Sequence, residues 1–208
     1  HLQPQVVMTP PERTTLTYGL DFMNEVDLTI CKVTPETMLS YRAFPVDIQK
    51  GPASLDCLER KTKHLTLPQS YATRKYLQVD LKDYYSNTIG NYVVVLSNPD
   101  YRRVSRTWDY TTSKQKFVLG EQLFEKTFLT VTTLAVGSKQ VERSDHYYTT
   151  EPGVRESFMK DKWPTNLYWV NNFKNLTPVL GAVVTPYVKT KTAIVKLSAQ
   201  KTDAEGIA

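Results

Sequence analysis

Side chains that could carry chemistry are few in this sequence, and the three histidines are the first to consider. His1, His64 and His146 do not have the spacing of a metal site. His146 lies in the stretch ERSDHYYTTE, residues 142–151, which also offers three carboxylates. These side chains offer the ligand types of a cation site, but mixed polar stretches of this kind are far more often solvated loops. We therefore predict a loop rather than a metal centre.

The carboxylates of Asp203 and Glu205, in the closing segment TDAEGIA, resemble half of a calcium-binding loop. The continuing D-x-[DN]-x-[DN]-G pattern and the later glutamate that a calcium loop requires are missing. The segment instead has the composition of a type I turn, with Gly206 in the left-handed position of a bulged hairpin. We predict a hairpin turn here.

Two cysteines, Cys31 and Cys57, are the candidates for nucleophilic or redox chemistry. Neither has a neighbouring histidine that could act as its base. They could form one disulfide in an exported protein or remain two buried thiols, and the sequence does not decide between these. The sequence contains no G-x-S-x-G elbow, no P-loop and no G-x-G-x-x-G loop.

Two further features could mark a surface site. Asn175-Leu176-Thr177 matches a glycosylation sequon, although the following Pro178 disfavours its use. Aromatic side chains could line a carbohydrate or peptide surface, but aromatics of a sandwich more often pack in its core or hairpins. The aromatic candidates are Tyr147, Tyr148, Trp163 and Trp169. No residue set requires catalysis, so we predict a protein that is not an enzyme, with no catalytic, metal-binding or cofactor-binding residues and no cofactor.

Length and charge limit the number of domains and the classes of protein to which the chain can belong. The chain has 208 residues, enough for one large domain or two of about 100 residues each. Its formal net charge of +5 is dispersed, without a run of five or more basic residues, which disfavours nucleic-acid binding. No apolar run is long enough to cross a bilayer as a helix. The chain opens at His1 without an initiator Met or a signal segment, so we expect a processed protein or an excised piece.

The elements that must position these residues are mostly short strands, because β-branched and aromatic residues alternate between turn signals. One short helical turn, capped by Ser54 and carrying Leu55 and Leu58, is the one expected helix. Strands are predicted over residues 15–20, 26–33, 38–44, 75–81, 91–97, 103–111, 114–119, 126–136, 166–171, 182–188 and 192–198.

Two of these strands indicate how the sheets are buried. In KYLQVDL, residues 75–81, Leu77, Val79 and Leu81 define an inward face. NYVVVLS, residues 91–97, is apolar on both faces, as in a central strand that is covered on both sides. A parallel sheet would need crossover helices, and these are missing. The pattern therefore predicts an all-β fold of two tandem antiparallel β-sandwiches of the Ig-like kind.

The predicted strands divide the chain into three parts. Residues 1–13 contain three prolines and predict an extended lead-in. The first sandwich is expected over residues 14–124 and the second over residues 125–208. Residues 137–164 lack periodicity and predict a long loop within the second part. Because few strands remain there, we expect the second sandwich to be incomplete.

The segments LYWVNNFKNLTPVLGAVVTPY and TDAEGIA resemble the bacterial alpha-2-macroglobulin family, in which a "vWVtd" strand precedes a "kPVaGAxVxvy" strand and a "TDadGvA" turn. LQVDLKDYYSNTIGNYVVVLSNP and FLTVTTLAV resemble further segments of that family, and together the likenesses cover about half of the chain. Other extracellular Ig-like repeats share the Pro-Val-x-Gly-Ala and Asp-x-x-Gly pair. The matching residues in the first two segments are Trp169, Val170, Asn171, Pro178, Val179, Gly181, Ala182, Val184, Thr202, Asp203, Gly206 and Ala208.

The resemblance implies two macroglobulin-like domains of a large protease inhibitor that entraps proteases. Family members that trap covalently carry a Cys-x-Glu-Gln thioester motif, whereas Glu121-Gln122 here follows Leu119-Gly120. The chain would then be a non-catalytic scaffold whose partners are neighbouring domains of the same chain and, for the parent protein, target proteases. The implied location is the periplasm or cell envelope, with the parent tethered to the inner membrane. The alternative is an Ig-like repeat module of a surface adhesin or glycan-binding protein.

Overall fold

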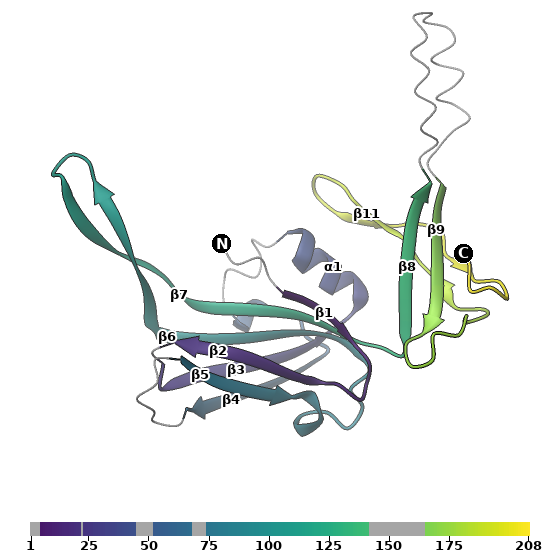
Figure 1. The fold of residues 1–208 in the computed structure, drawn as a ribbon, viewed down its shortest axis with the longest axis horizontal. Coiled ribbons are helices and arrows are strands. Elements are labelled where there is room, and N and C mark those ends of the chain that lie inside the picture. Colours follow the sequence, from purple (N-terminus) through teal and green to yellow (C-terminus); the bar gives the residue numbers. More distant parts are fainter. Residues whose placement is uncertain (1–4, 22, 45–51, 68–73, 142–164) are drawn as a thin grey trace, which may run out of the picture. The chain divides into compact units, whose positions relative to one another are not determined.

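The computed structural model describes the chain except for residues 1–4, 22, 45–51, 68–73 and 142–164 (Figure 1). The chain divides into two compact units. The first comprises His1–Thr132 with Lys189–Ile194, and the second comprises Thr133–Val188 with Val195–Ala208. Residues 124 and 125, between which the sequence analysis places its boundary, lie inside strand β7 (Lys114–Val131). The main division between the two units falls after Thr132, one residue beyond the end of β7.

Among its described residues, the first unit contains seven strands in two sheets. A five-stranded sheet has the order β1-β7-β6-β3-β4, and β2 and β5 form a separate antiparallel pair. All neighbours in the large sheet are antiparallel except β1 and β7, which run parallel. The mainly antiparallel all-β expectation is confirmed. The strands not yet bounded are β1 (Gln5–Thr9), β2 (Thr15–Asp21), β3 (Glu25–Val33), β4 (Glu59–Thr66), β5 (Arg74–Asp80) and β6 (Gly90–Asp109).

The larger core of this unit lies between its two sheets. Val26, Leu28 and Ile30 of β3 project into it. Val79 and Leu81 are buried there and Leu77 packs against them, so the inward face expected for this segment is confirmed. Alternate residues of β6, among them Tyr92, Val94 and Leu96, fill the same core and are fully buried. Burial of these apolar side chains is the main force that holds the sandwich together.

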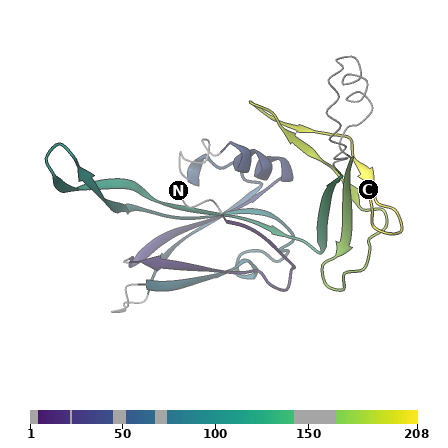
Figure 2. The same cartoon turned by 45° about the horizontal axis from the view of Figure 1, so that its top comes forward.

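The opposite face of the five-stranded sheet is covered by helix α1 (Pro35–Ala43) (Figure 2). Val93, Val95 and Phe128 pack there against Met38 and Tyr41 of the helix. Strand β6 is therefore buried on both faces, as its sequence predicts.

The helix corrects the expectation of a strand over residues 38–44. Thr34 is extended and its hydroxyl accepts a hydrogen bond from the N–H of Thr37 at 3.1 Å, which makes it a helix N-cap. Pro35 stands at the start, where its missing N–H leaves no hydrogen bond unmade. Glu36 in the first turn and Arg42 in the last complement the helix dipole. These end signals override the strand-like pattern.

Replacing the N-cap should destabilise the first unit by a modest amount. We expect Thr34→Ala to lower the free energy of unfolding by about 1 kcal/mol, because the N–H of Thr37 loses its acceptor. Urea unfolding followed by circular dichroism measures the change. Thr34→Ser keeps the hydroxyl and should remain within a few tenths of a kcal/mol of the parent. Equal losses for the two variants would contradict the capping role.

Three other segments of the first unit differ from expectation. Gln5–Thr9 forms edge strand β1 instead of an extended lead-in, since it pairs with the end of β7. The expected helical turn after Ser54 is a 3-10 turn, Pro52–Ser54, which ends at that residue. Glu59 begins β4, a lysine-rich edge strand on which most side chains face solvent. Such an edge has little apolar alternation to reveal it, and its charges discourage pairing with other chains.

The second unit is built around the antiparallel pair β8 (Leu134–Val141) and β9 (Thr165–Asn172). The expected strand 126–136 is broken at residues 132 and 133, between β7 and β8, and the expected strand 182–188 is two short strands. Residues 137–141 of the expected loop belong to β8, and residues 142–164 lie outside the described residues. No helix in the described part of the chain is long and apolar enough to cross a membrane. The short strands are β10 (Val183–Val184), β11 (Tyr187–Lys189), β12 (Ile194–Lys196) and β13 (Gln200–Lys201).

Candidate functional site

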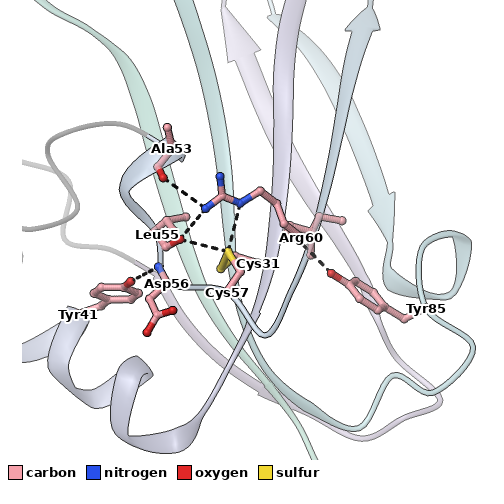
Figure 3. Close-up of a disulfide and its surroundings, with 9 residues drawn as sticks. Cys31, Tyr41, Ala53, Leu55, Asp56, Cys57, Arg60 and Tyr85 are labelled. Carbon is pink, nitrogen blue, oxygen red and sulfur yellow. Dashed lines mark hydrogen bonds between the residues drawn. A yellow bond between two sulfur atoms is a disulfide. The ribbon is translucent and has the colours of Figure 1, made fainter.

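Cys31 and Cys57 form a disulfide, which decides between the two states that the sequence leaves open (Figure 3). Their Cα atoms lie 5.2 Å apart, and 26 residues separate them in sequence. Cys31 is fully buried in β3 beneath α1, and Cys57 stands two residues before β4. The bridge therefore ties the segment that follows α1 to β3, an interior strand of the sheet that lies between β6 and β4.

Side chains around the disulfide hold the same segment. Arg60 donates from Nε to Sγ of Cys57 at 3.4 Å, and its guanidinium also donates to the carbonyl oxygens of Leu55 and Ala53 (Figure 3). The hydroxyl of Tyr41 in α1 accepts a hydrogen bond from the N–H of Asp56 at 2.6 Å. Both sulfurs are used in the bridge, so neither is a thiolate nucleophile. The arrangement stabilises the fold and carries no nucleophilic chemistry.

His64 lies on β4 opposite Asp27 of β3. Its Nδ1 is 2.8 Å from Oδ1 of Asp27, and its Nε2 is 3.5 Å from Oε2 of Glu25. The hydrogen bond to Asp27, together with the charges of the two carboxylates, raises the pKa of His64 above its ordinary 6.5. The described residues contain no cluster of histidine, cysteine and acidic side chains suited to a metal ion. His1 and His146 lie outside the described residues.

The imidazole of His64 should therefore titrate above pH 6.5. The folded protein binds this proton more tightly than the unfolded chain does. Its contribution to stability is thus complete below the unfolded pKa and is lost as the pH rises through the folded pKa. An NMR titration of the ring protons, assigned with His64→Gln, measures the midpoint, and Asp27→Asn should move it back toward 6.5. A midpoint at or below that value in the parent would refute the pairing.

Two tyrosines and two lysines form a second polar cluster at one end of the sandwich. The rings of Tyr85 and Tyr92 lie 5.2 Å apart, with Nζ of Lys32 6.0 and 5.7 Å from their centres. Nζ of Lys61 is 5.8 Å from the ring of Tyr85, whose hydroxyl donates to the carbonyl of Ile30 at 3.2 Å. Burial, with the charge of Glu59, raises the pKa of Tyr92 to about 12. This phenol stays protonated at neutral pH, so the cluster contributes aromatic packing and cation–π contacts rather than an acid–base pair.

The segment from Asp203 to Gly206 forms the predicted hairpin turn. Oδ1 of Asp203 accepts hydrogen bonds from the N–H groups of Glu205 and Ile207 at 3.1 and 2.8 Å. Gly206 has a φ of +75°, which confirms its left-handed conformation. The carboxylate of Asp203 is therefore used within the turn, in agreement with the turn interpretation and not with a calcium loop.

This turn and the segment around Pro178 pack on β9. Val170 donates its N–H to the carbonyl of Gly206 at 2.8 Å, and Val179 donates to the carbonyl of Val170 at 2.9 Å. Ala208 and Tyr168 exchange two backbone hydrogen bonds of 3.0 Å. Three residues of the resemblance that lie far apart in sequence, Val179, Gly206 and Ala208, thus meet at one strand.

Of the aromatic candidates, Trp169 is half-buried in β9, whereas Tyr147, Tyr148 and Trp163 lie outside the described residues. The sequon asparagine, Asn175, is exposed and accepts hydrogen bonds from the N–H and hydroxyl of Thr177. The structure also exposes a pair that the sequence analysis did not single out. Trp108 and Tyr110, at the tip of the β6–β7 hairpin, are 51 % and 88 % exposed. In the sequence, these two aromatic residues stand just before the Thr-Thr-Ser turn, which could have indicated their exposure. Aromatic side chains of a strand, however, usually pack in the core.

Comparison with solved structures gives a match over nearly the whole chain. The structure is similar to that of native alpha-2-macroglobulin from Escherichia coli spanning domains NIE-MG1, with a TM-score of 0.59 and 15 % sequence identity. The match covers 99 % of this chain and 82 % of that one. No protein-family model and no curated protein matches the sequence. The resemblance found in the sequence is thus confirmed at the level of fold, and the chain has an all-β, macroglobulin-like fold.

Proposed function

We propose that the chain is a non-catalytic scaffold of a large bacterial alpha-2-macroglobulin-like protein that inhibits endopeptidases by entrapment. The observation that carries this proposal is the fold likeness to domains NIE-MG1 of alpha-2-macroglobulin from Escherichia coli, over 99 % of the chain. The role of such a scaffold is mechanical: rigid sandwiches hold other parts of a large chain in place, and no reacting group is needed.

The chemistry of the described residues supports the same proposal. Both cysteines are used in a disulfide, and the one described histidine, His64, pairs with carboxylates on an open strand surface. Among the described residues, no serine or cysteine nucleophile is therefore hydrogen-bonded to a histidine base. The disulfide also favours an oxidising compartment. We accordingly propose the periplasm or cell envelope as the location, with neighbouring domains and target proteases as partners.

An inhibition assay tests the proposal. The 208-residue chain alone, in molar excess over trypsin, should leave the digestion of casein unchanged, because a scaffold has no inhibitory chemistry of its own. The full-length polypeptide that contains the chain should suppress the same digestion. Failure of the full-length polypeptide to protect casein from trypsin or from a second protease of different specificity would refute the proposed function.

Calorimetry addresses the adhesin and glycan-binding alternative. Titration of the chain with a panel of soluble oligosaccharides should release no saturable heat if the chain is a scaffold. A saturable isotherm that disappears in Trp169→Ala would instead support a glycan-binding surface on β9 and would count against the scaffold.

A further inference from the structure

The hairpin of β6 and β7 extends beyond the sheet that contains it (Figure 1). Strand β3 pairs with β6 only as far as Ser97, and β1 pairs with β7 only over Thr127–Val131. Within the described part of the chain, residues 102–109 and 114–122 pair only with each other. We call residues 102–122 the β-arm.

The β-arm begins at an irregularity in the ladder. The register shifts between Asn98 and Arg102 and again between Arg102 and Val104. Bulges of this kind bend a strand and increase its twist, so the ribbon departs from the direction of the sheet at this point. A two-stranded ribbon is only marginally stable in water by itself, and both of its edges carry unpaired backbone groups. A structure of this kind is typical of an element that another surface covers.

The pairing register places four of the five apolar residues of the paired arm, all but Val118, at one alternating set of ladder positions. Val104 lies opposite Leu119, Arg106 opposite Phe117, and Trp108 opposite Gln115, and these pairs alternate with the more polar pairs of the other face. Aromatic residues and arginine are enriched at the centres of protein–protein interfaces. The face therefore has the composition of an interface along the ribbon, and not only at its tip.

The turn at the end of the arm is fixed by local hydrogen bonds. Oδ1 of Asp109 accepts from the N–H groups of Thr111 and Thr112 at 2.9 and 3.4 Å, and Ser113 adopts a φ of 51°. The turn holds Tyr110 at 88 % exposure, beside the half-exposed Trp108. Exposed tryptophan and tyrosine on an ordered turn can bury a large area at little cost in conformational entropy.

The charge of the arm indicates the kind of partner. Residues 102–122 hold five basic and two acidic side chains, so that +3 of the chain's net +5 lies in this one ribbon. An acidic surface would attract it, whereas a second copy of this basic chain would not. A lipid surface is also a poorer match, because the apolar positions are spread along one face and the tip carries Asp109.

We propose that the β-arm is a docking element for an acidic protein surface, with Trp108 as its anchor and the arginines of the arm as its charge contacts. The paired residues Arg106 and Phe117 lie at the middle of the docking face. This inference concerns a binding surface, and it does not depend on the role of the chain in protease entrapment.

The probe is a random peptide library displayed on phage and selected against the immobilised 208-residue chain. The peptides recovered should be rich in Asp and Glu together with apolar residues. Calorimetry with the best synthetic peptide should then show binding that weakens as salt rises from about 0.05 to 0.5 M. Trp108→Ala and Arg106→Glu should each weaken this binding about tenfold or more, as for an interface hot spot.

Lys63→Glu is the matched control, because it reverses an exposed basic charge on β4, outside the arm. This variant should change the peptide affinity by less than about twofold. Circular dichroism of every variant shows that the fold is retained. The proposal is overturned if the selected peptides are not acidic, or if Trp108→Ala binds them as well as the parent does. Arm-dependent binding to vesicles of phosphatidylglycerol and phosphatidylcholine, or arm-dependent dimers in sedimentation, would overturn it equally.

Discussion

Reduction of the Cys31–Cys57 disulfide should lower the free energy of unfolding of the first unit by about 3.5 kcal/mol, the chain-entropy value for a loop of this length. The bridge closes a loop of 26 residues, and opening it gives the unfolded chain many more conformations. The bond joins the fully buried Cys31 of β3 to a segment in which Leu55 is the one buried apolar side chain among the described residues 52–58. Urea unfolding with and without a reductant measures the difference.

Mass spectrometry and one variant provide the controls for this prediction. Without reductant, the intact chain should be lighter by two hydrogen atoms than the reduced chain. Cys57→Ser should show the lowered stability from the outset and should lose nothing more when a reductant is added. A reductant that destabilises this variant as much as the parent would show that the loss does not come from the bridge.

Gly206→Ala should destabilise the second unit by about 3 kcal/mol, the sum of left-handed backbone strain and a steric clash. Gly206 has a φ of +75°, and a methyl group there would stand 2.5 Å from the carbonyl oxygen of Val170. It would also lie 3.2 Å from Cβ of Pro178. Val170 lies in β9 and Pro178 in a segment that packs on this strand, and neither can move without disturbing the backbone hydrogen bonds that Val170 makes with Gly206 and Val179. Thermal unfolding followed by tryptophan fluorescence reports the loss.

Gly181→Ala is the matched control, because it shares the backbone strain without the clash. Gly181 has a φ of +74°, and a methyl group there would meet nothing within 4 Å. The loss of stability in Gly181→Ala should therefore be limited to the backbone strain, about 1–2 kcal/mol. Equal losses at the two glycines would contradict the close packing of the turn against Val170.

The buried strands were predictable because their sequence patterns have one physical interpretation. NYVVVLS is apolar at every position that a doubly covered strand must bury, and β6 lies between a second sheet and a helix. Helix α1 was harder to predict, since MLSYRAF also fits a strand. The features that decide it precede the segment, in the N-cap of Thr34 and in Pro35. Strand β4 was also hard to predict, because Leu65 is its one partly buried apolar side chain. Its place in the sheet comes from its pairing with β3 and not from an alternating pattern of its own.

At the candidate sites too, features that depend on local contacts were predictable from the sequence, whereas features that depend on long-range strand pairing were not. The turn from Asp203 to Gly206 was predictable, since its hydrogen bonds join residues at most four positions apart. The disulfide was not, because it depends on a β3–β4 pairing that sets Cys31 opposite Arg60. The exposure of Trp108 was also beyond prediction, since it depends on the neighbouring strands ending before the arm does.

The proposed scaffold role is tested most directly by one ratio, measured on trypsin mixed with the full-length polypeptide that contains this chain. The ratio compares the remaining hydrolysis of a small chromogenic peptide with the remaining digestion of casein. Entrapment excludes large substrates by size and leaves the protease active, so we predict that peptide hydrolysis is retained while casein digestion is lost. Loss of both activities would indicate inhibition at the protease active site, and loss of neither would indicate no inhibition. Either result would contradict the proposed role in entrapment.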